Sequence, residues 1–179
     1  MGNIALQTSA KYCKFDAAIM IGRHAMAGHT TGVMAHSYSS VAITSMTLNG
    51  NLIGEIGIEA LQLASLNIPV IMIAGDEAAC AEGLTLLNKV AIAPVKQGFA
   101  QHAAISMHSQ DACQLIYEQT SKALSNLQHY TIIQPPAHYC LEVSCIDKRS
   151  AKARAKRKNA VFLPPNKYRI ETNDPWQLG

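Results

Sequence analysis

Short apolar runs alternate with segments of helical periodicity in the first half of the chain. Residues 15–21 and 69–75 are apolar runs that end at or just before a glycine, and residues 90–95 are apolar almost throughout. The segments 54–69 and 77–87 space their apolar residues as on one face of a helix. Strands that are apolar on both faces and alternate with helices are typical of a largely parallel sheet covered by helices. The pattern therefore predicts an α/β fold for this half.

The second half orders its elements differently. Its patterns predict a helix over 109–128 that Ser109 caps, a half-exposed strand over 141–145, a helical basic segment over 148–158, and strands over 160–163 and 168–172. In the first half, Asn49-Gly50 between two β-rich stretches also predicts a hairpin. We therefore expect an α/β core over residues 1–98, a mostly parallel sheet flanked by helices, with a smaller C-terminal α+β subdomain over 99–179.

The composition is that of a globular protein of the cytoplasm. The 179 residues suffice for one domain with a small appendage, and 49% of them are hydrophobic. No apolar run approaches the roughly 18 to 20 residues that cross a membrane, and the N-terminus lacks the pattern of a signal peptide. The five cysteines are scattered without a C-x-x-C pair, which favours reduced thiols. We expect a cytoplasmic location and no membrane partner.

The net charge of +3 conceals a local excess, because seven of the fifteen basic residues fall within residues 148–158. Such a run can bind nucleic acid, but here no aromatic residues are interleaved and no nucleic-acid motif is recognisable. A solvated helix face is the simpler interpretation. We therefore expect no nucleic acid partner.

Candidate chemistry concentrates between residues 22 and 40, which hold three of the seven histidines. His24, His29 and His36 follow the first apolar strand, and ligands of open α/β sheets usually bind at strand ends. A hydrolytic zinc site needs nitrogen and oxygen ligands and an open position for water. The spacing matches no zinc motif, so each histidine could serve such a site or be a hydrogen-bonded or exposed imidazole.

Charged residues at element boundaries are further candidates. Glu55 stands between two glycines that permit close backbone approach, so its carboxylate could face a metal, or it could only favour the start of the helix. Glu59 could be a second ligand, and we expect a solvated charge. Asp76 is expected to cap the next helix, and Lys96 could contact a substrate carboxylate or reach the surface.

Five motifs occur in an order and spacing that are similar to one family. They are GRHAMAG at 22–28, GVMAHS at 32–37, IGEIGIEA at 53–60, VIMIAGDE at 70–77 and VKQG at 95–98. Through them the chain resembles the zinc-dependent D-aminopeptidase (DppA-type metallopeptidase) family, strongly over residues 15–100 and weakly beyond.

The resemblance implies a metallopeptidase with two zinc ions per site. Such an enzyme acts on short peptides with an N-terminal D-residue, in a ring-stacked homo-oligomer that encloses the active sites. By motif, His24 and Glu55 would be zinc ligands and His36 the catalytic histidine beside the metals, while His29 would have no role.

The chain also departs from the family pattern. Members begin with a strand that carries an Asp-x-Glu-Gly motif and continue with an Asn-Asp-x-His-like segment, and both supply zinc ligands. Neither occurs here, so the resemblance implies an incomplete ligand set. Three explanations stay open: a separate chain supplies the missing ligands, the gene product is truncated or decayed, or a one-metal site recruits Glu59, His29 or His36. The alternative to a hydrolase is a non-catalytic assembly or binding subunit, and we expect weak or no peptidase activity from this chain alone.

Overall fold

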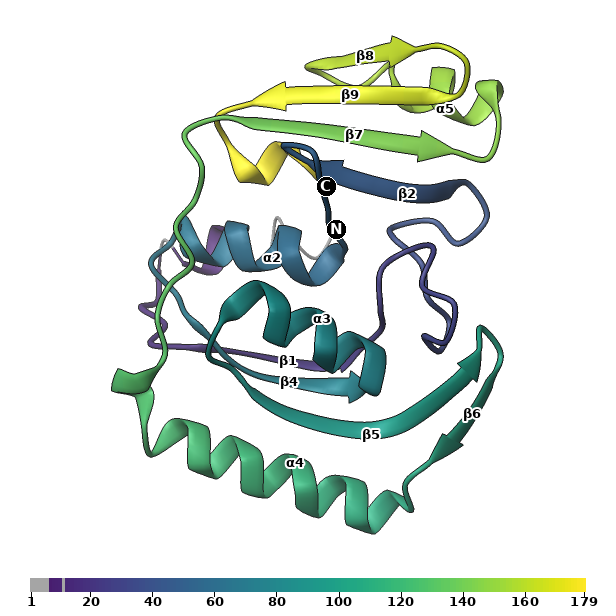
Figure 1. Ribbon diagram of the computed structural model, residues 1–179. Coiled ribbons are helices and arrows are strands. Elements are labelled where there is room, and N and C mark those ends of the chain that lie inside the picture. The colour runs from purple at the N-terminus through teal and green to yellow at the C-terminus, as the bar shows by residue number, and fades with distance from the viewer. Residues whose placement is uncertain (1–6, 11) are drawn as a thin grey trace.

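The computed structural model describes residues 7–10 and 12–179, and its strands form two sheets (Figure 1). Sheet A has the strand order β1 (Ala18–Arg23), β4 (Val70–Asp76), β5 (Ala91–Ala100) and β6 (Ala103–Ser106). The first three strands are parallel, whereas β6 pairs with β5 in antiparallel orientation. All seven residues of β4 are buried, as expected of a central strand covered on both faces. The predicted α/β fold with a mostly parallel sheet is confirmed.

Sheet B is antiparallel throughout. Its strand order is β3 (Asn51–Leu52), β2 (Ile43–Leu48), β7 (Tyr139–Cys145), β9 (Lys167–Thr172) and β8 (Ala160–Leu163). Alternate residues of β7 are buried, from Tyr139 to Cys145, and those between them are half-buried. This period of two turns one face of sheet B toward the interior of the protein.

Helices occupy three places around the sheets (Figure 1). α2 (Glu55–Ala64) and α3 (Glu77–Leu87) lie on the face of sheet A that is turned toward sheet B, and α4 (Ser109–Leu124) lies on the opposite face. α5 (Lys148–Arg154) packs against sheet B, and two short 3-10 helices, η1 (Leu127–His129) and η2 (Pro175–Gln177), follow α4 and β9. In the part of the chain that the structure describes, no helix is long and apolar enough to cross a membrane.

Helix α2 is buried on two sides because it joins the cores of both sheets. Ile58 and Leu61 pack into the cluster formed by sheet B. Ile56, Ala60 and Leu63 pack into the cluster between α2, α3 and sheet A. A helix that is apolar on both sides belongs in the interior. Its first residue is therefore held in a fixed position relative to both sheets.

Several local predictions are confirmed, whereas the bounds of other predicted elements differ from those in the structure. The hairpin is present, with Thr47 opposite Leu52, and Asn49 and Gly50 have the positive φ angles of 50° and 87° that suit a two-residue turn. α3 spans the predicted range. The predicted helix over 109–128 ends at Leu124, and its N-cap is His108 rather than Ser109, so that cap prediction was wrong by one residue.

Each of the two sheets contains strands from before and from after residue 98. The hairpin of β2 and β3 pairs with β7, whereas β6 and α4 belong with sheet A. The division into units 1–98 and 99–179 stays a prediction. The hairpin and β7 are hydrogen-bonding partners in sheet B, although about 90 residues separate them in sequence.

Candidate metal centre

The three histidines lie in the histidine loop (residues 24–42), which joins β1 to β2 without forming a helix or strand. Its interior is nevertheless ordered by specific bonds. The backbone amide of Ala27 donates to Ser37 Oγ at 3.1 Å, and the amide of His36 donates to the Ala25 carbonyl at 3.2 Å. Ala25 and Ser37 are fully buried. The loop is therefore a packed part of the fold.

Carboxylates from the helical layer and from β4 hold the outside of this loop. Each accepts one backbone amide of the loop: Met26 N donates to Glu82 Oε2 at 2.8 Å, Val33 N to Asp76 Oδ2 at 2.6 Å, and Tyr38 N to Glu55 Oε1 at 2.8 Å. Hydrogen bonds to ionised acceptors are among the stronger ones in proteins. The other oxygen of Asp76 accepts from Ala79 N, which confirms its predicted role as the cap of α3. Sequence reasoning missed Glu82, which lies inside a helix with no motif around it.

His24, His36 and Glu55 converge at one end of the loop. Each offers one ligand atom, and these atoms all lie within 4.8 Å of one another. The Nε2 atom of His24 is 3.7 Å from Oε1 of Glu55. Two imidazole nitrogens and one carboxylate oxygen form a donor set that catalytic zinc sites use. The donor chemistry of these residues therefore fits a zinc ion.

The two histidines are distinguished by how their rings are held. They stack with centroids 3.9 Å apart and an interplanar angle of 18°. Nδ1 of His24 bonds to the Ala25 carbonyl at 3.2 Å, and Nδ1 of His36 bonds to the Met34 carbonyl at 2.7 Å. A carbonyl only accepts, so Nδ1 carries the proton in each neutral ring and Nε2 is left with its lone pair. Each neutral ring therefore presents the lone pair of Nε2 for a metal or for proton transfer.

A cavity of about 190 Å³ opens beside this cluster. Its lining includes His24, His36, Asp76 and Lys96, together with Met34, whose positive φ of 51° is unusual outside glycine. The cavity thus brings together residues from β1, the histidine loop, β4 and β5.

Three other side chains near the cluster have assigned partners. Glu59 forms an ion pair with Arg23 at 2.7 Å, although the angles are not those of a hydrogen bond. The Glu59 side chain keeps 31% of its surface exposed, and its charge pairs with a cation that β1 presents beside α2. His29 Nδ1 accepts from Gly32 N at 3.0 Å and stands outside the metal set. Burial raises the pKa of Glu82 to about 7, which the bond from Met26 N counteracts only in part.

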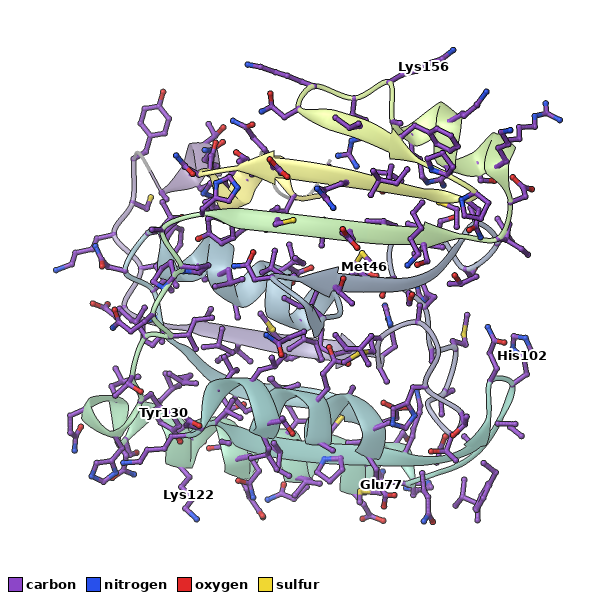
Figure 2. All side chains as sticks on the ribbon, turned by 45° about the horizontal axis from the view of Figure 1, so that its top comes forward. Met46, Glu77, His102, Lys122, Tyr130 and Lys156 are labelled. Carbon is purple, nitrogen blue, oxygen red and sulfur yellow. The ribbon has the colours of Figure 1, made fainter. Side chains whose placement is uncertain are left out.

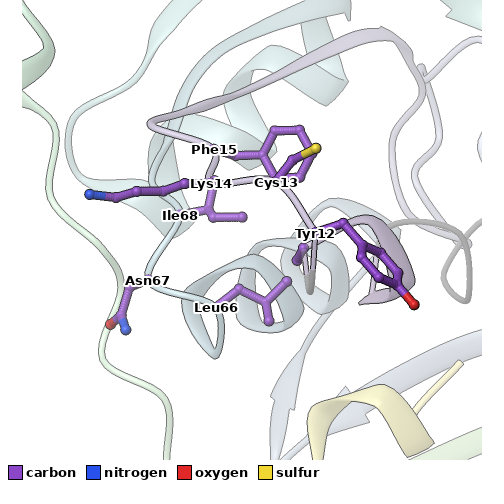
Figure 3. Close-up of a pocket in the computed structure, with 8 residues that line it drawn as sticks. Tyr12, Cys13, Lys14, Phe15, Leu66, Asn67 and Ile68 are labelled. Atoms are coloured by element: carbon purple, nitrogen blue, oxygen red, sulfur yellow. The ribbon is translucent and has the colours of Figure 1, made fainter.

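Two further cavities lie away from this centre. One of about 410 Å³ lies between residues 12–15 and 66–68, and its lining mixes apolar side chains with Cys13, Lys14 and Asn67 (Figure 3). The other lies along the basic face of α5, where Lys156 projects from the outer edge of the molecule (Figure 2). Neither contains a residue of the metal set.

The comparisons with known proteins agree with this geometry. The sequence model of the D-aminopeptidase family matches residues 8–178. The chain belongs to the D-aminopeptidase family. It is 33% identical over 129 residues to the D-aminopeptidase of Bacillus subtilis (strain 168), which covers 72% of this chain and 46% of that protein. The chain thus spans about half the length of this curated relative.

A solved structure shows the same fold. It is described as the Zn-dependent D-aminopeptidase DppA from Bacillus subtilis, a self-compartmentalizing protease, and it superposes with a TM-score of 0.85 at 26% identity. The match covers 92% of this chain and 60% of that one. The chain therefore has the fold of this solved zinc-dependent D-aminopeptidase.

Proposed function

We propose that this chain forms the histidine-bearing part of a zinc aminopeptidase centre that hydrolyses short peptides with an N-terminal D-residue. The observation that carries the proposal is the convergence of His24, His36 and Glu55 beside a cavity, in a chain that belongs to the D-aminopeptidase family. The cavity of about 190 Å³ is smaller than the roughly 300 to 1,000 Å³ of typical ligand pockets, which favours a short substrate.

In this proposal His24 and Glu55 hold zinc, and His36 moves protons. When bound, zinc polarises a carbonyl oxygen and lowers the pKa of a water toward about 7. The ring stacking supports these different roles for the two histidines, with His24 as the zinc ligand and His36 as the group that transfers protons. Ligand lone pairs lie in the ring plane, so two nearly parallel rings 3.9 Å apart would direct theirs at one ion only if one ring turned, although their nitrogens lie close enough. Nε2 of His36 is then free to accept a proton and return it to the leaving amine.

The number of ligands bears on how the centre is completed. Two zinc ions need more donors than the three that converge within the described residues. We propose that further ligands come from a separate chain or segment. We also propose a homo-oligomer, because the solved relative is described as self-compartmentalizing. The short ligand set favours one second candidate, a non-catalytic assembly or binding subunit that keeps at most one metal.

Zinc binding and peptide hydrolysis test these roles together. We expect His24→Ala to weaken zinc binding at least tenfold, measured by titration calorimetry. We expect His36→Ala to keep zinc, while whatever release of D-alanine from D-alanyl-D-alanine the wild-type chain shows falls about a hundredfold. His102→Ala, an exposed histidine in the turn between β5 and β6 (Figure 2), is the matched control and should change neither. Unchanged zinc affinity in His24→Ala would contradict the proposal, and zinc binding without hydrolysis would favour the non-catalytic subunit.

Glu55 allows a sharper dissection, because it faces His24 and also accepts from Tyr38 N. Glu55→Gln keeps an oxygen for the amide and loses the charge, whereas Glu55→Ala loses both. We expect both variants to weaken zinc binding and only Glu55→Ala to destabilise the metal-free chain, by about 1 to 3 kcal/mol. Full zinc affinity in Glu55→Gln would remove Glu55 from the ligand set.

A further inference from the structure

We propose that the Lys96 ammonium binds the C-terminal carboxylate of the substrate, so that the site selects dipeptides with a free carboxyl end. This proposal rests on the proposed function and names the substrate class of the same cavity. It assigns a binding role to a residue that is outside the metal set.

Lys96 reaches the cavity from β5. It lies opposite Asp76 of β4 in the parallel register, and both line the cavity with His24 and His36. Gly98 projects to the same side of β5, since side chains two residues apart share a face. A Cβ on Gly98 would overlap the carbonyl oxygen of Thr31. This face of β5 is therefore pressed against the histidine loop, and Lys96 lies on the same face where β5 borders the cavity.

The charge of Lys96 is not neutralised by the protein. Across residues 7–10 and 12–179, no carboxylate oxygen lies within 4.0 Å of its ammonium. Both oxygens of Asp76 are engaged by the amides of Val33 and Ala79, and Arg23 is paired with Glu59. Lys96 is thus the unpaired cation of the cavity, and an anionic group of the ligand is its natural complement.

The reach of a peptide explains why the anion is a C-terminal carboxylate. If the scissile carbonyl lies at the metal set, the carboxylate of a dipeptide follows one residue later. Each extra residue moves the carboxylate up to about 3.6 Å further away. A lysine carries a compact charge on a flexible four-carbon stem. Its ammonium can therefore reach the carboxylate of a dipeptide better than the more distant carboxylate of a longer peptide. The cavity of about 190 Å³ is also small, which favours a short ligand.

The test compares D-alanyl-D-alanine with its C-terminal amide, which lacks the charge. Binding of both to the zinc-loaded chain is measured by titration calorimetry, and hydrolysis is measured in parallel. We expect the wild type to bind the free acid about tenfold more tightly than the amide, a modest ratio because Lys96 is exposed to water. Lys96→Met should bring this ratio near one, and Lys96→Arg should keep most of it.

Lys89→Met is the matched control, because Lys89 is exposed just before β5 and does not line the cavity. It should leave the ratio at the wild-type value. The role of Lys96 is overturned if the wild type binds acid and amide equally well, or if Lys96→Met keeps the wild-type affinity ratio. The hydrolase proposal still stands in either case if both ligands are cleaved. Preference for the acid in a chain that binds no zinc instead overturns the hydrolase proposal and supports Lys96.

Discussion

Glu82 provides a sensitive test of how the histidine loop is held. Burial raises the pKa of this carboxyl from 4.5 to about 7, while the bond from Met26 N and the charge of Arg23 counteract the rise, and the charges of Asp76 and Glu55 add to it. The folded chain therefore keeps this proton to a higher pH than the unfolded chain does. By linkage, the free energy of unfolding falls as the pH rises from about 4.5 to about 7.

Replacing Glu82 by glutamine removes this titration and keeps an oxygen that can accept from Met26 N. A pKa difference of this size corresponds to about 3 kcal/mol, of which roughly 2 to 3 kcal/mol falls between pH 5 and pH 8. Glu82→Gln should therefore gain that much stability relative to the wild type across this range. Urea unfolding of the metal-free proteins at several pH values measures the difference.

The control for this experiment is Glu77→Gln, because Glu77 lies exposed in the first turn of the same helix. It should not show the pH-dependent gain of about 2 to 3 kcal/mol that is expected of Glu82→Gln. If the curves of Glu82→Gln and the wild type stay parallel from pH 5 to pH 8, Glu82 does not titrate in this range and the reasoning from its burial fails.

Three further outcomes are expected. Gly98→Ala should destabilise the chain by about 1 to 3 kcal/mol in urea unfolding, because its methyl group would overlap the Thr31 carbonyl, and an unchanged midpoint would refute that close approach. Gln62→Ala should cost about 1 to 3 kcal/mol, because the buried Gln62 amide donates to the Pro175 carbonyl at 3.2 Å; full stability would show that this bond contributes nothing. Zinc at 100 times its dissociation constant should stabilise the chain by about 2.7 kcal/mol and raise its Tm, an effect that a chelator reverses; no shift would speak against a formed site.

The fold could be predicted where a local pattern determines the element. Strand β4 and helix α3 combine an apolar run, a capping aspartate and helical periodicity, and both were predicted with nearly correct bounds. Strand β6 was not predicted, because all four of its residues are exposed and its sequence shows no alternation of apolar and polar residues. The pairing of β2 with β7 joins segments far apart in sequence, and no local pattern encodes such a partner.

The candidate site divides in the same way. His24, His36 and Glu55 belong to short motifs that a family resemblance can carry, and the structure brings them together. Glu82 was not found, because its contact with Met26 spans 56 residues and nothing in its helix sets it apart. The pairing of Glu59 with Arg23 was also missed, since it depends on how α2 lies across β1. Motifs thus indicate the ligands, whereas the side chains that hold them depend on tertiary packing.

The way the loop is held implies that much of the centre is formed before any metal binds. Its three carboxylate anchors are Glu55, Asp76 and Glu82, and only Glu55 also belongs to the metal set. The segments around Met26 and Val33 therefore depend on groups that a metal does not touch. A carboxylate offers about four lone-pair positions, so Glu55 can accept from Tyr38 N and still face a cation. Metal binding then needs to order little beyond the ligands themselves, which is the physical basis of a preorganised site.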